Sequence, residues 1–286
     1  MNAPVTTLVR RARLGLIAAR SLARRARPNL IAGRSLARAA RLNSFAAPLL
    51  AVALLTATMA VGCSSIPERV LNVASPYFDA TTLDLSRVLP PPPGDDSEIT
   101  RNEIALMLKL QQERTPEEAA RARADVSYSV FRFADAIGNP ENFNAETLPR
   151  TRSLFRKVTY EEGAVVQAGK RGFKRPRPFV LEPRIEPIVR RPTNDSYPSG
   201  HAMWSRVVGL VLADMLPEYS ERIMARADEY ASHRVVAGVH YPSDVEAGKH
   251  AGTALAAFLF ASPAFQPDYA EARQELRAAL KLPLEQ

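Results

Sequence analysis

Residues 234–244 read RVVAGVHYPSD and place an arginine, a histidine and an aspartate at fixed spacings. Pro242 stands in the first turn of an apolar stretch that we expect to form a helix over residues 243–261. His240 and Asp244 are four residues apart, so a carboxylate lies within reach of the imidazole where this helix begins. Such a carboxylate fixes the tautomer of a histidine and stabilises the charge that the ring gains.

A second segment, residues 197–201, reads YPSGH and introduces another apolar helical stretch. The first N–H groups of a helix have no partner within it, and they attract anions. Gly200 permits a close approach of the backbone to such an anion, and His201 would be held beside it. This segment therefore predicts one wall of an anion site.

A third segment, residues 170–178, reads KRGFKRPRP. Lys170 and Arg177, together with Arg234, can neutralise the oxygens that carry charge in phosphoryl transfer. Each of the three segments alone has an ordinary structural explanation: a loop, a paired histidine or a solvated basic face. Their combination predicts a phosphate site.

The joint pattern resembles the phosphatidic-acid-phosphatase type 2 (PAP2) superfamily. Its signature is a lysine, six residues and Arg-Pro; then Pro-Ser-Gly-His; then Ser-Arg, five residues, a histidine, three residues and an aspartate. This chain fits the signature with Lys170, Arg177-Pro178, Pro198-Ser199-Gly200-His201, Arg234, His240 and Asp244. Within the superfamily it looks most like the class A bacterial non-specific acid phosphatases. It shares their Leu-Pro-Pro-Pro-Pro stretch, here residues 89–93, and the resemblance covers about residues 85–280.

The resemblance implies an acid phosphatase of broad specificity for small phosphate monoesters. His240 would be the nucleophile that forms a phosphohistidine, Asp244 would orient its ring, and His201 would be the general acid and then the base. The phosphoryl oxygens would be held by Lys170, Arg177, Ser199, Gly200 and Arg234. We expect no metal and no other cofactor, and a mildly acidic optimum, because one imidazole must be neutral and the other protonated.

One position departs from the family pattern. The serine before the arginine of the third motif is replaced by His233, with Ser232 just ahead of it. We expect His233 to be a tolerated neighbour without a catalytic role, although donation to a phosphate oxygen stays open. We expect His250, further along the last motif's helix, to be structural or exposed.

The rest of the chain predicts an all-α fold, a single helical bundle over residues 87–286 preceded by an irregular proline-rich arm. An apolar face formed by Ile104, Leu106, Met107 and Leu110 indicates a helix over residues 99–113. Further helices are expected over residues 116–137, 144–171 (broken by Gly163 and Gly169), 199–215, 218–236, 243–261 and 267–280, with a loop over 172–197.

The net charge of +8 comes from the beginning of the chain. Residues 1–62 hold ten arginines and no acidic residue, which leaves 28 Lys and Arg against 30 Asp and Glu in the remainder. The basic balance therefore argues for a leader and against nucleic-acid binding. We expect residues 1–62 to be an Arg-rich leader with a signal peptide, and residues 63–86 to be a linker.

The uncharged run over residues 45–62 ends at Cys63, the only cysteine of the chain. The sequence AVGC at 60–63 resembles the lipobox of bacterial lipoproteins, and ordinary cleavage or an uncleaved anchor remain alternatives. We expect export to the periplasm and a lipid anchor at Cys63, and Ser64 favours the outer membrane. A homo-oligomer stays open.

Three other functions fit the same residues. A vanadium-dependent haloperoxidase would hold vanadate in the pocket, and a lipid phosphatase would act at a membrane. A lipoprotein that binds phosphate without turning it over would need the cations, but it would have no use for His240 paired with Asp244.

Overall fold

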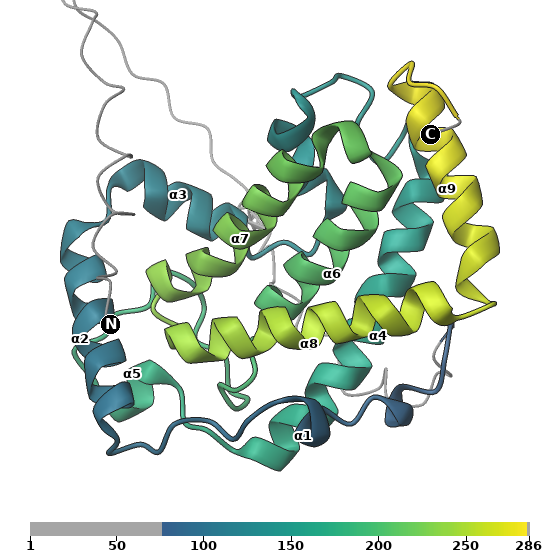
Figure 1. Cartoon of the computed structure of the whole chain (residues 1–286). Helices are drawn as coiled ribbons and strands as arrows, with labels where there is room; N and C mark the ends of the chain where they lie inside the picture. Colours follow the sequence, from purple (N-terminus) through teal and green to yellow (C-terminus); the bar gives the residue numbers. More distant parts are fainter. Residues whose placement is uncertain (1–75, 285–286) are drawn as a thin grey trace, which may run out of the picture. The chain divides into compact units, whose positions relative to one another are not determined.

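The computed structural model describes residues 76–284, and it is helical throughout, with no strand in this part of the chain (Figure 1). The all-α prediction is therefore confirmed for the described residues. The expected leader, Cys63 and most of the linker lie outside them. The α-helices are α1 (Leu85–Val88), α2 (Glu98–Glu113), α3 (Pro116–Ala124), α4 (Pro149–Phe173), α5 (Pro178–Leu181), α6 (Gly200–Met215), α7 (Ser220–Val236), α8 (Pro242–Ala261) and α9 (Phe265–Ala279). The 3₁₀ helices are η2 (Ala80–Thr82), η3 (Val130–Ile137) and η4 (Pro217–Tyr219).

Helix α6 is the centre of the bundle, with α7 and α8 packed along it (Figure 1). Helix α4 packs against α6 and against α9, which lies at the right edge of the view. It is apolar almost all round, as a helix that is covered on every side must be. Trp204 in its second turn is fully buried. The contact with α8 is close because a Cβ at Gly248 or Gly252 would run into the backbone of α6.

The turn between α7 and α8 brings two of the sequence motifs together. Gly238 has φ +76°, a left-handed conformation that favours glycine, and this reverses the chain between Arg234 and His240. The backbone N–H of Ser199 donates to the carbonyl of Asp244 at 2.9 Å, which joins the beginning of α6 to the beginning of α8. The site is thus built where the ends of several helices meet.

Two helix predictions were wrong. The helix expected over 116–137 ends at Ala124 and resumes as η3, because the side chain of Asp125 binds Arg226 and His233 of α7 and the carbonyl of Ser127 accepts from Tyr230. The helix expected to break at Gly163 and Gly169 is continuous as α4. A Cβ at Gly169 would lie 2.8 Å from Cδ1 of Leu85, so this glycine makes room for α1.

The apolar face predicted for residues 99–113 is also only partly correct. Met107 is buried, whereas Leu106 is 44% exposed. The buried side of α2 instead carries Thr100 and Glu103, whose side chains turn toward Arg175. The loop expected over 172–197 contains the last two residues of α4 and the short helix α5.

Among the described residues, none of the helices combines the length and the apolar character that crossing a bilayer requires.

Candidate active site

Ser199 begins α6 as its N-cap, and its side chain accepts from the N–H of Ala202 at 3.4 Å. Serine is favoured at this position because it satisfies an N–H group that has no partner within the helix. Gly200 and His201 follow in the first turn, so the positive end of α6 and the imidazole lie side by side. The structure therefore places the second motif as the sequence predicts.

His201 is held at both ring nitrogens. Its Nε2 lies 3.2 Å from the carbonyl oxygen of Val126, and its Nδ1 lies 2.9 Å from the hydroxyl of Tyr128. A carbonyl can only accept, so Nε2 carries a proton, and Nδ1 of the neutral ring accepts from Tyr128. A short segment between α3 and η3 thus fixes the orientation of His201.

His240 is 2% exposed and lies between a cation and a carboxylate. Its Nε2 is 2.8 Å from Nη1 of Arg177, and its Nδ1 is 3.4 Å from Oδ2 of Asp244. Arginine only donates, so Nε2 is the nitrogen with the free electron pair and Nδ1–H faces the carboxylate. The pair at 240 and 244 forms as predicted.

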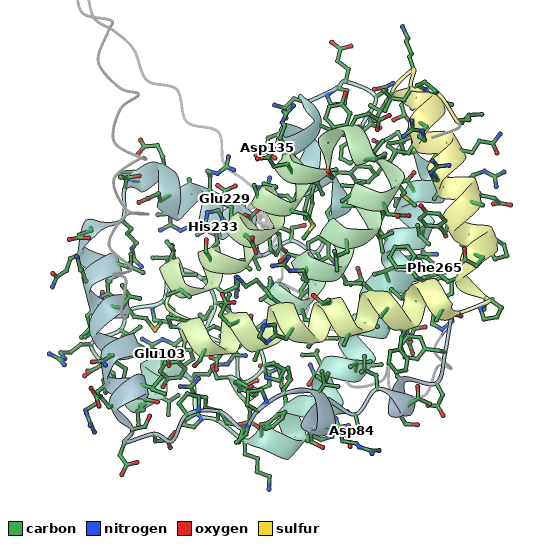
Figure 2. All side chains as sticks on the ribbon, viewed as in Figure 1. Asp84, Glu103, Asp135, Glu229, His233 and Phe265 are labelled. Atoms are coloured by element: carbon green, nitrogen blue, oxygen red, sulfur yellow. The ribbon has the colours of Figure 1, made fainter. Side chains whose placement is uncertain are left out.

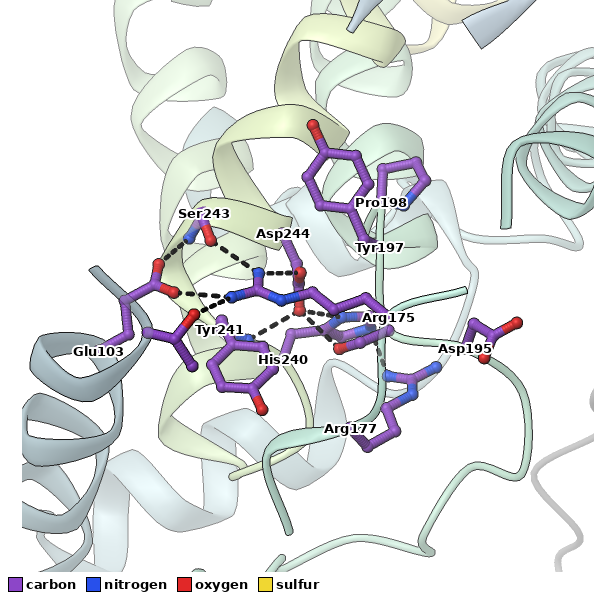
Figure 3. Close-up of polar contacts among 12 residues, drawn as sticks. Glu103, Arg175, Arg177, Asp195, Tyr197, Pro198, His240, Tyr241, Ser243 and Asp244 are labelled. Carbon is purple, nitrogen blue, oxygen red and sulfur yellow. Dashed lines mark hydrogen bonds and ion pairs between the residues drawn. The ribbon is translucent and has the colours of Figure 1, made fainter. Parts of the chain in front are cut away.

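Asp244 is completely buried and is held by several donors (Figure 3). Its Oδ1 accepts from Nη1 of Arg175 at 2.7 Å. Its Oδ2 accepts from the hydroxyl of Ser196 at 2.5 Å and from the N–H of Tyr241 at 2.9 Å. These bonds fix the orientation of the carboxylate toward His240.

Arg175 extends this network to α2. Its Nη2 donates to Oε2 of Glu103 at 3.0 Å, and Oε1 of Glu103 accepts from the N–H of Ser243 at 2.6 Å (Figure 3). The guanidinium also lies 3.9 Å from the ring centroid of Tyr241. The positive charge of the buried Arg175 is thus balanced by a carboxylate on each side, Glu103 and Asp244.

Lys170 and Arg177 lie in the site, but both are engaged by the protein. Nζ of Lys170 donates to the carbonyls of residues 195, 196 and 198, at 2.7, 3.1 and 2.8 Å, and so holds the segment that leads into α6. Arg177 donates to the backbone and side-chain oxygens of Asn194 and to the carbonyl of Val239. Burial lowers the pKa of Arg177 to about 10.

The pKa values of His201 and His240 both lie well below the usual range. Burial is the largest cause for each ring. The charge of Arg234 is the next cause for His201, whereas His240 is affected by Arg177, Lys170 and then Arg234. Both rings therefore favour the neutral form in this cationic, desolvated pocket.

All eight residues of the predicted site come together at this place: Lys170, Arg177, Ser199, Gly200, His201, Arg234, His240 and Asp244. Cys63, the predicted lipidation site, lies outside the described residues. Between residues 76 and 284, no group of three or more His, Cys, Asp or Glu side chains is arranged to hold a metal ion.

Comparison with known proteins decides the family. A sequence profile of the PAP2 superfamily matches residues 159–267, which include all eight site residues. A non-specific acid phosphatase from Salmonella typhimurium is 32% identical over 199 residues, 66% of this chain and 78% of that protein. The chain belongs to the PAP2 superfamily. The predicted family and enzyme class, acid phosphatase, are thereby confirmed.

Two further proteins are similar to this chain. A non-specific acid phosphatase from Providencia stuartii is 28% identical over 206 residues, 69% of this chain and 82% of its own length. Among solved structures, a bacterial vanadium-dependent chloroperoxidase has a TM-score of 0.49 at 13% identity, covering 67% of this chain and 53% of its own.

Sequence reasoning missed several residues of this PAP2 site. Arg175 stands inside the third segment, but the signature assigns no role to it. Glu103 and Tyr128 reach the site from α2 and from a segment expected to be helical, so no local pattern marks them. His250 is exposed, which agrees with one of the two alternatives given for it.

Proposed function

We propose that this chain hydrolyses phosphate monoesters through a covalent phosphohistidine on His240, with His201 as the general acid and base. The orientation of His240 carries the proposal, because its unprotonated Nε2 faces Arg177 while its Nδ1 faces Asp244. A ring held in this way presents an electron pair that can attack phosphorus. The cation beside it can stabilise the charge on the phosphoryl oxygens. The acid phosphatase relatives support the same reaction class.

In the first step, Nε2 of His240 attacks phosphorus as the bond to the ester oxygen breaks. The leaving alkoxide takes a proton from His201. Asp244 accepts the Nδ1–H bond and stabilises the positive charge of the phosphorylated ring. The alcohol then leaves, and the phosphoryl group stays on nitrogen.

In the second step, a water molecule attacks the phosphorus and gives a proton to His201. The phosphorus–nitrogen bond breaks, and the electron pair returns to Nε2 of His240. Inorganic phosphate leaves, and the next turnover begins with a protonated His201. This cycle consumes one water for each ester cleaved.

The buried cations account for the charge stabilisation in this scheme. Arg177 and Arg234, with the N–H groups that begin α6, would hold the phosphoryl oxygens. Lys170, whose three donors bind backbone carbonyls, would contribute through its positive charge. We therefore expect turnover without an added metal. Because burial lowers the pKa of His201, its acid form is favoured at acid pH, which supports an acidic optimum. These residues address the phosphoryl group, so we propose broad specificity for the alcohol.

The test is hydrolysis of p-nitrophenyl phosphate by the purified protein between pH 4 and 8, with and without EDTA. His240→Ala should abolish turnover, whereas His250→Ala, an exposed histidine on the same helix, should leave it unchanged. Circular dichroism checks that both variants fold. An alkaline quench with ³²P-labelled substrate should trap label on the wild type and none on His240→Ala.

Other outcomes would replace the proposal. Peroxide-dependent bromide oxidation after vanadate loading, without ester hydrolysis, would identify a haloperoxidase. Hydrolysis confined to phosphatidate in vesicles would identify a lipid phosphatase. Phosphate binding by a folded protein that does not turn over any ester would identify a phosphate-binding protein.

We also propose that the chain is exported and anchored by a lipid on Cys63, with the outer membrane as its destination. The uncharged run before the only cysteine supports this proposal. Mass spectrometry of the protein from membrane fractions should find acylated Cys63 at the N-terminus, and Cys63→Ser should release the protein from the membrane. An unmodified cysteine in a soluble product would contradict it.

A further inference from the structure

A buried cluster lies beside the active site, around Asp125. This aspartate is fully buried, and its Oδ2 lies 2.6 Å from Nδ1 of His233. Its Oδ1 accepts from Arg226 at 2.6 Å and from two nitrogens of Arg132 at 3.0 and 3.1 Å. Burial alone raises the pKa of Asp125, but the bonds from His233 and Arg226 hold it well below its usual range. The cluster is therefore a charged link between α7 and the segment after α3.

The residues that follow Asp125 are the ones that hold His201. The carbonyl of Val126 accepts from Nε2 of His201, and the hydroxyl of Tyr128 bonds to Nδ1. This segment lies between α3 and η3, and the N–H groups of Val126 and Ser127 donate at 3.3 Å to the carbonyls of Arg123 and Ala124 at the end of α3. Two contacts join the segment to α7. Asp125 binds Arg226 and His233, and the carbonyl of Ser127 accepts from the hydroxyl of Tyr230.

His233 is the α7 residue that departs from the signature. It is 5% exposed, and it directly precedes Arg234. We propose that His233 is a positioning residue for His201, acting through Asp125 to hold the Val126 carbonyl against the catalytic ring. This inference rests on the proposed role of His201 as the acid.

Other charged groups face the same histidine. Glu229 lies one turn earlier on α7, with Oε1 3.7 Å from Nε2 of His233, and the two are neighbours along α7 in Figure 2. Glu229 is itself paired with Arg121 of α3, which also reaches Asp135 of η3. Nδ1 of His233 is thus committed to Asp125, and Nε2 faces the more exposed carboxylate.

The consequence for His201 has a definite sign. A hydrogen bond from Nε2 to a carbonyl favours the protonated ring, and the Val126 bond raises the pKa of His201 against the larger effect of burial. Loosening the segment removes that support, so the acid form of His201 should be lost at a lower pH. A purely structural role for His233 would not move this titration.

The test uses two amide variants that differ in reach. The amide nitrogen of asparagine approximates Nδ1 of histidine, and that of glutamine approximates Nε2. His233→Asn should keep the bond to Asp125, whereas His233→Gln should lose it. Ser232→Ala, at an exposed neighbour, is the control.

We expect kcat of His233→Gln to fall about 10-fold, a part of the roughly 10²–10⁴ that a general acid contributes. KM should stay within about 2-fold, because the phosphate ligands are untouched. The alkaline limb of the kcat profile should move to lower pH, and His233→Asn and Ser232→Ala should match the wild type. Thermal unfolding of each variant confirms that it folds.

NMR titration of the His201 ring gives a readout that does not need activity. In His233→Gln its midpoint should fall by about half a pH unit, and in His233→Asn it should not. If the wild type lacked turnover but this shift appeared, the positioning role would stand and the proposed function would fail. The inference about His233 would be overturned if the wild type were active and His233→Gln had the same His201 titration midpoint and the same kcat as His233→Asn.

Discussion

Nη1 of Arg177 lies 2.8 Å from Nε2 of His240, the nitrogen to which we assign the attack on phosphorus. The guanidinium therefore occupies the direction from which a phosphoryl group must approach. It is also bound to Asn194 on the exposed side of the site. A substrate phosphate has to take over the contact between Arg177 and His240, and this exchange keeps the cation beside the reacting nitrogen.

Replacing Arg177 should affect both binding and the titration of His240. We expect Arg177→Ala to lower kcat/KM by about 10²–10³, the usual effect of losing one charge-stabilising donor. Arg177 is, after burial, the main cause that lowers the pKa of His240, so this pKa should rise. Attack needs the neutral ring, and the acid limb of the kcat/KM profile should therefore move to higher pH.

Arg190 offers the control for this measurement, because it is an exposed arginine from the same loop region. Arg190→Ala should leave kcat/KM within about 2-fold and the acid limb in place. An unchanged limb in Arg177→Ala would show that Arg177 does not set the protonation of His240.

Arg175 should be more important for stability than any exposed arginine. Arg175→Met leaves Glu103 and Asp244 buried without their cation, and breaking a buried pair costs about 3–5 kcal/mol. Arg184→Met, at an exposed pair with Glu182, should cost much less, because solvent screens the two charges. Urea unfolding measures both free energies. Equal losses would mean that the buried network contributes nothing specific.

The sequence predicted which residues come together in the candidate site, because a signature fixes neighbours along the chain. It could not predict Glu103 and Tyr128, which reach Arg175 and His201 only through tertiary packing. The same limit applies to α4, where the helix-breaking tendency of Gly169 is offset because Leu85 fills the space of its missing side chain.

Expectations based on hydrophobic periodicity failed for a related reason. On α2, Leu106 faces solvent and Glu103 is buried, because an ion pair with Arg175 decides which side turns inward. His233 was expected to be neutral to function, and no local pattern shows that it reaches Asp125, 108 residues away. Pairs of buried charges from distant elements carry no sequence period.

The crossing of α6 and α8 provides a matched pair of glycine variants. A Cβ at Gly248 would meet the carbonyl of Ser199, and a Cβ at Gly252 would meet that of Met203 one turn further on. Both alanine variants should be destabilised by about 1–3 kcal/mol through overpacking. Only Gly248→Ala presses on the residue that begins α6, so only it should lower kcat/KM, by about 10-fold.

Thermal unfolding and steady-state kinetics on the two variants check this expectation. If Gly252→Ala lost as much activity as Gly248→Ala at equal stability, the effect would come from general loosening of the bundle. The position of Ser199 would then not be the cause.

Glu162 should make stability depend on pH. Its carboxyl is 1% exposed, its Oε1 lies 3.2 Å from where a Cβ on Gly200 would stand, and that oxygen accepts no hydrogen bond within residues 76–284. Burial outweighs the attraction of Lys170 and raises the pKa of Glu162 from 4.5 to about 8. The folded state therefore binds this proton more tightly than the unfolded state does. Its stabilising effect is complete below pH 4.5 and is lost as the pH rises to about 8.

Glu162→Gln removes the titration and keeps the shape of the side chain. Between pH 5 and 8, the free energy of unfolding of the wild type should fall by roughly a few kcal/mol relative to this variant, because each tenfold difference in proton affinity between the two states is worth about 1.4 kcal/mol. Glu146→Gln, at an exposed glutamate, should follow the wild type. Urea unfolding at pH 5, 6.5 and 8 measures the three curves. Parallel curves for Glu162→Gln and the wild type would mean that Glu162 is ionised in the folded protein, with Lys170 or water compensating its charge.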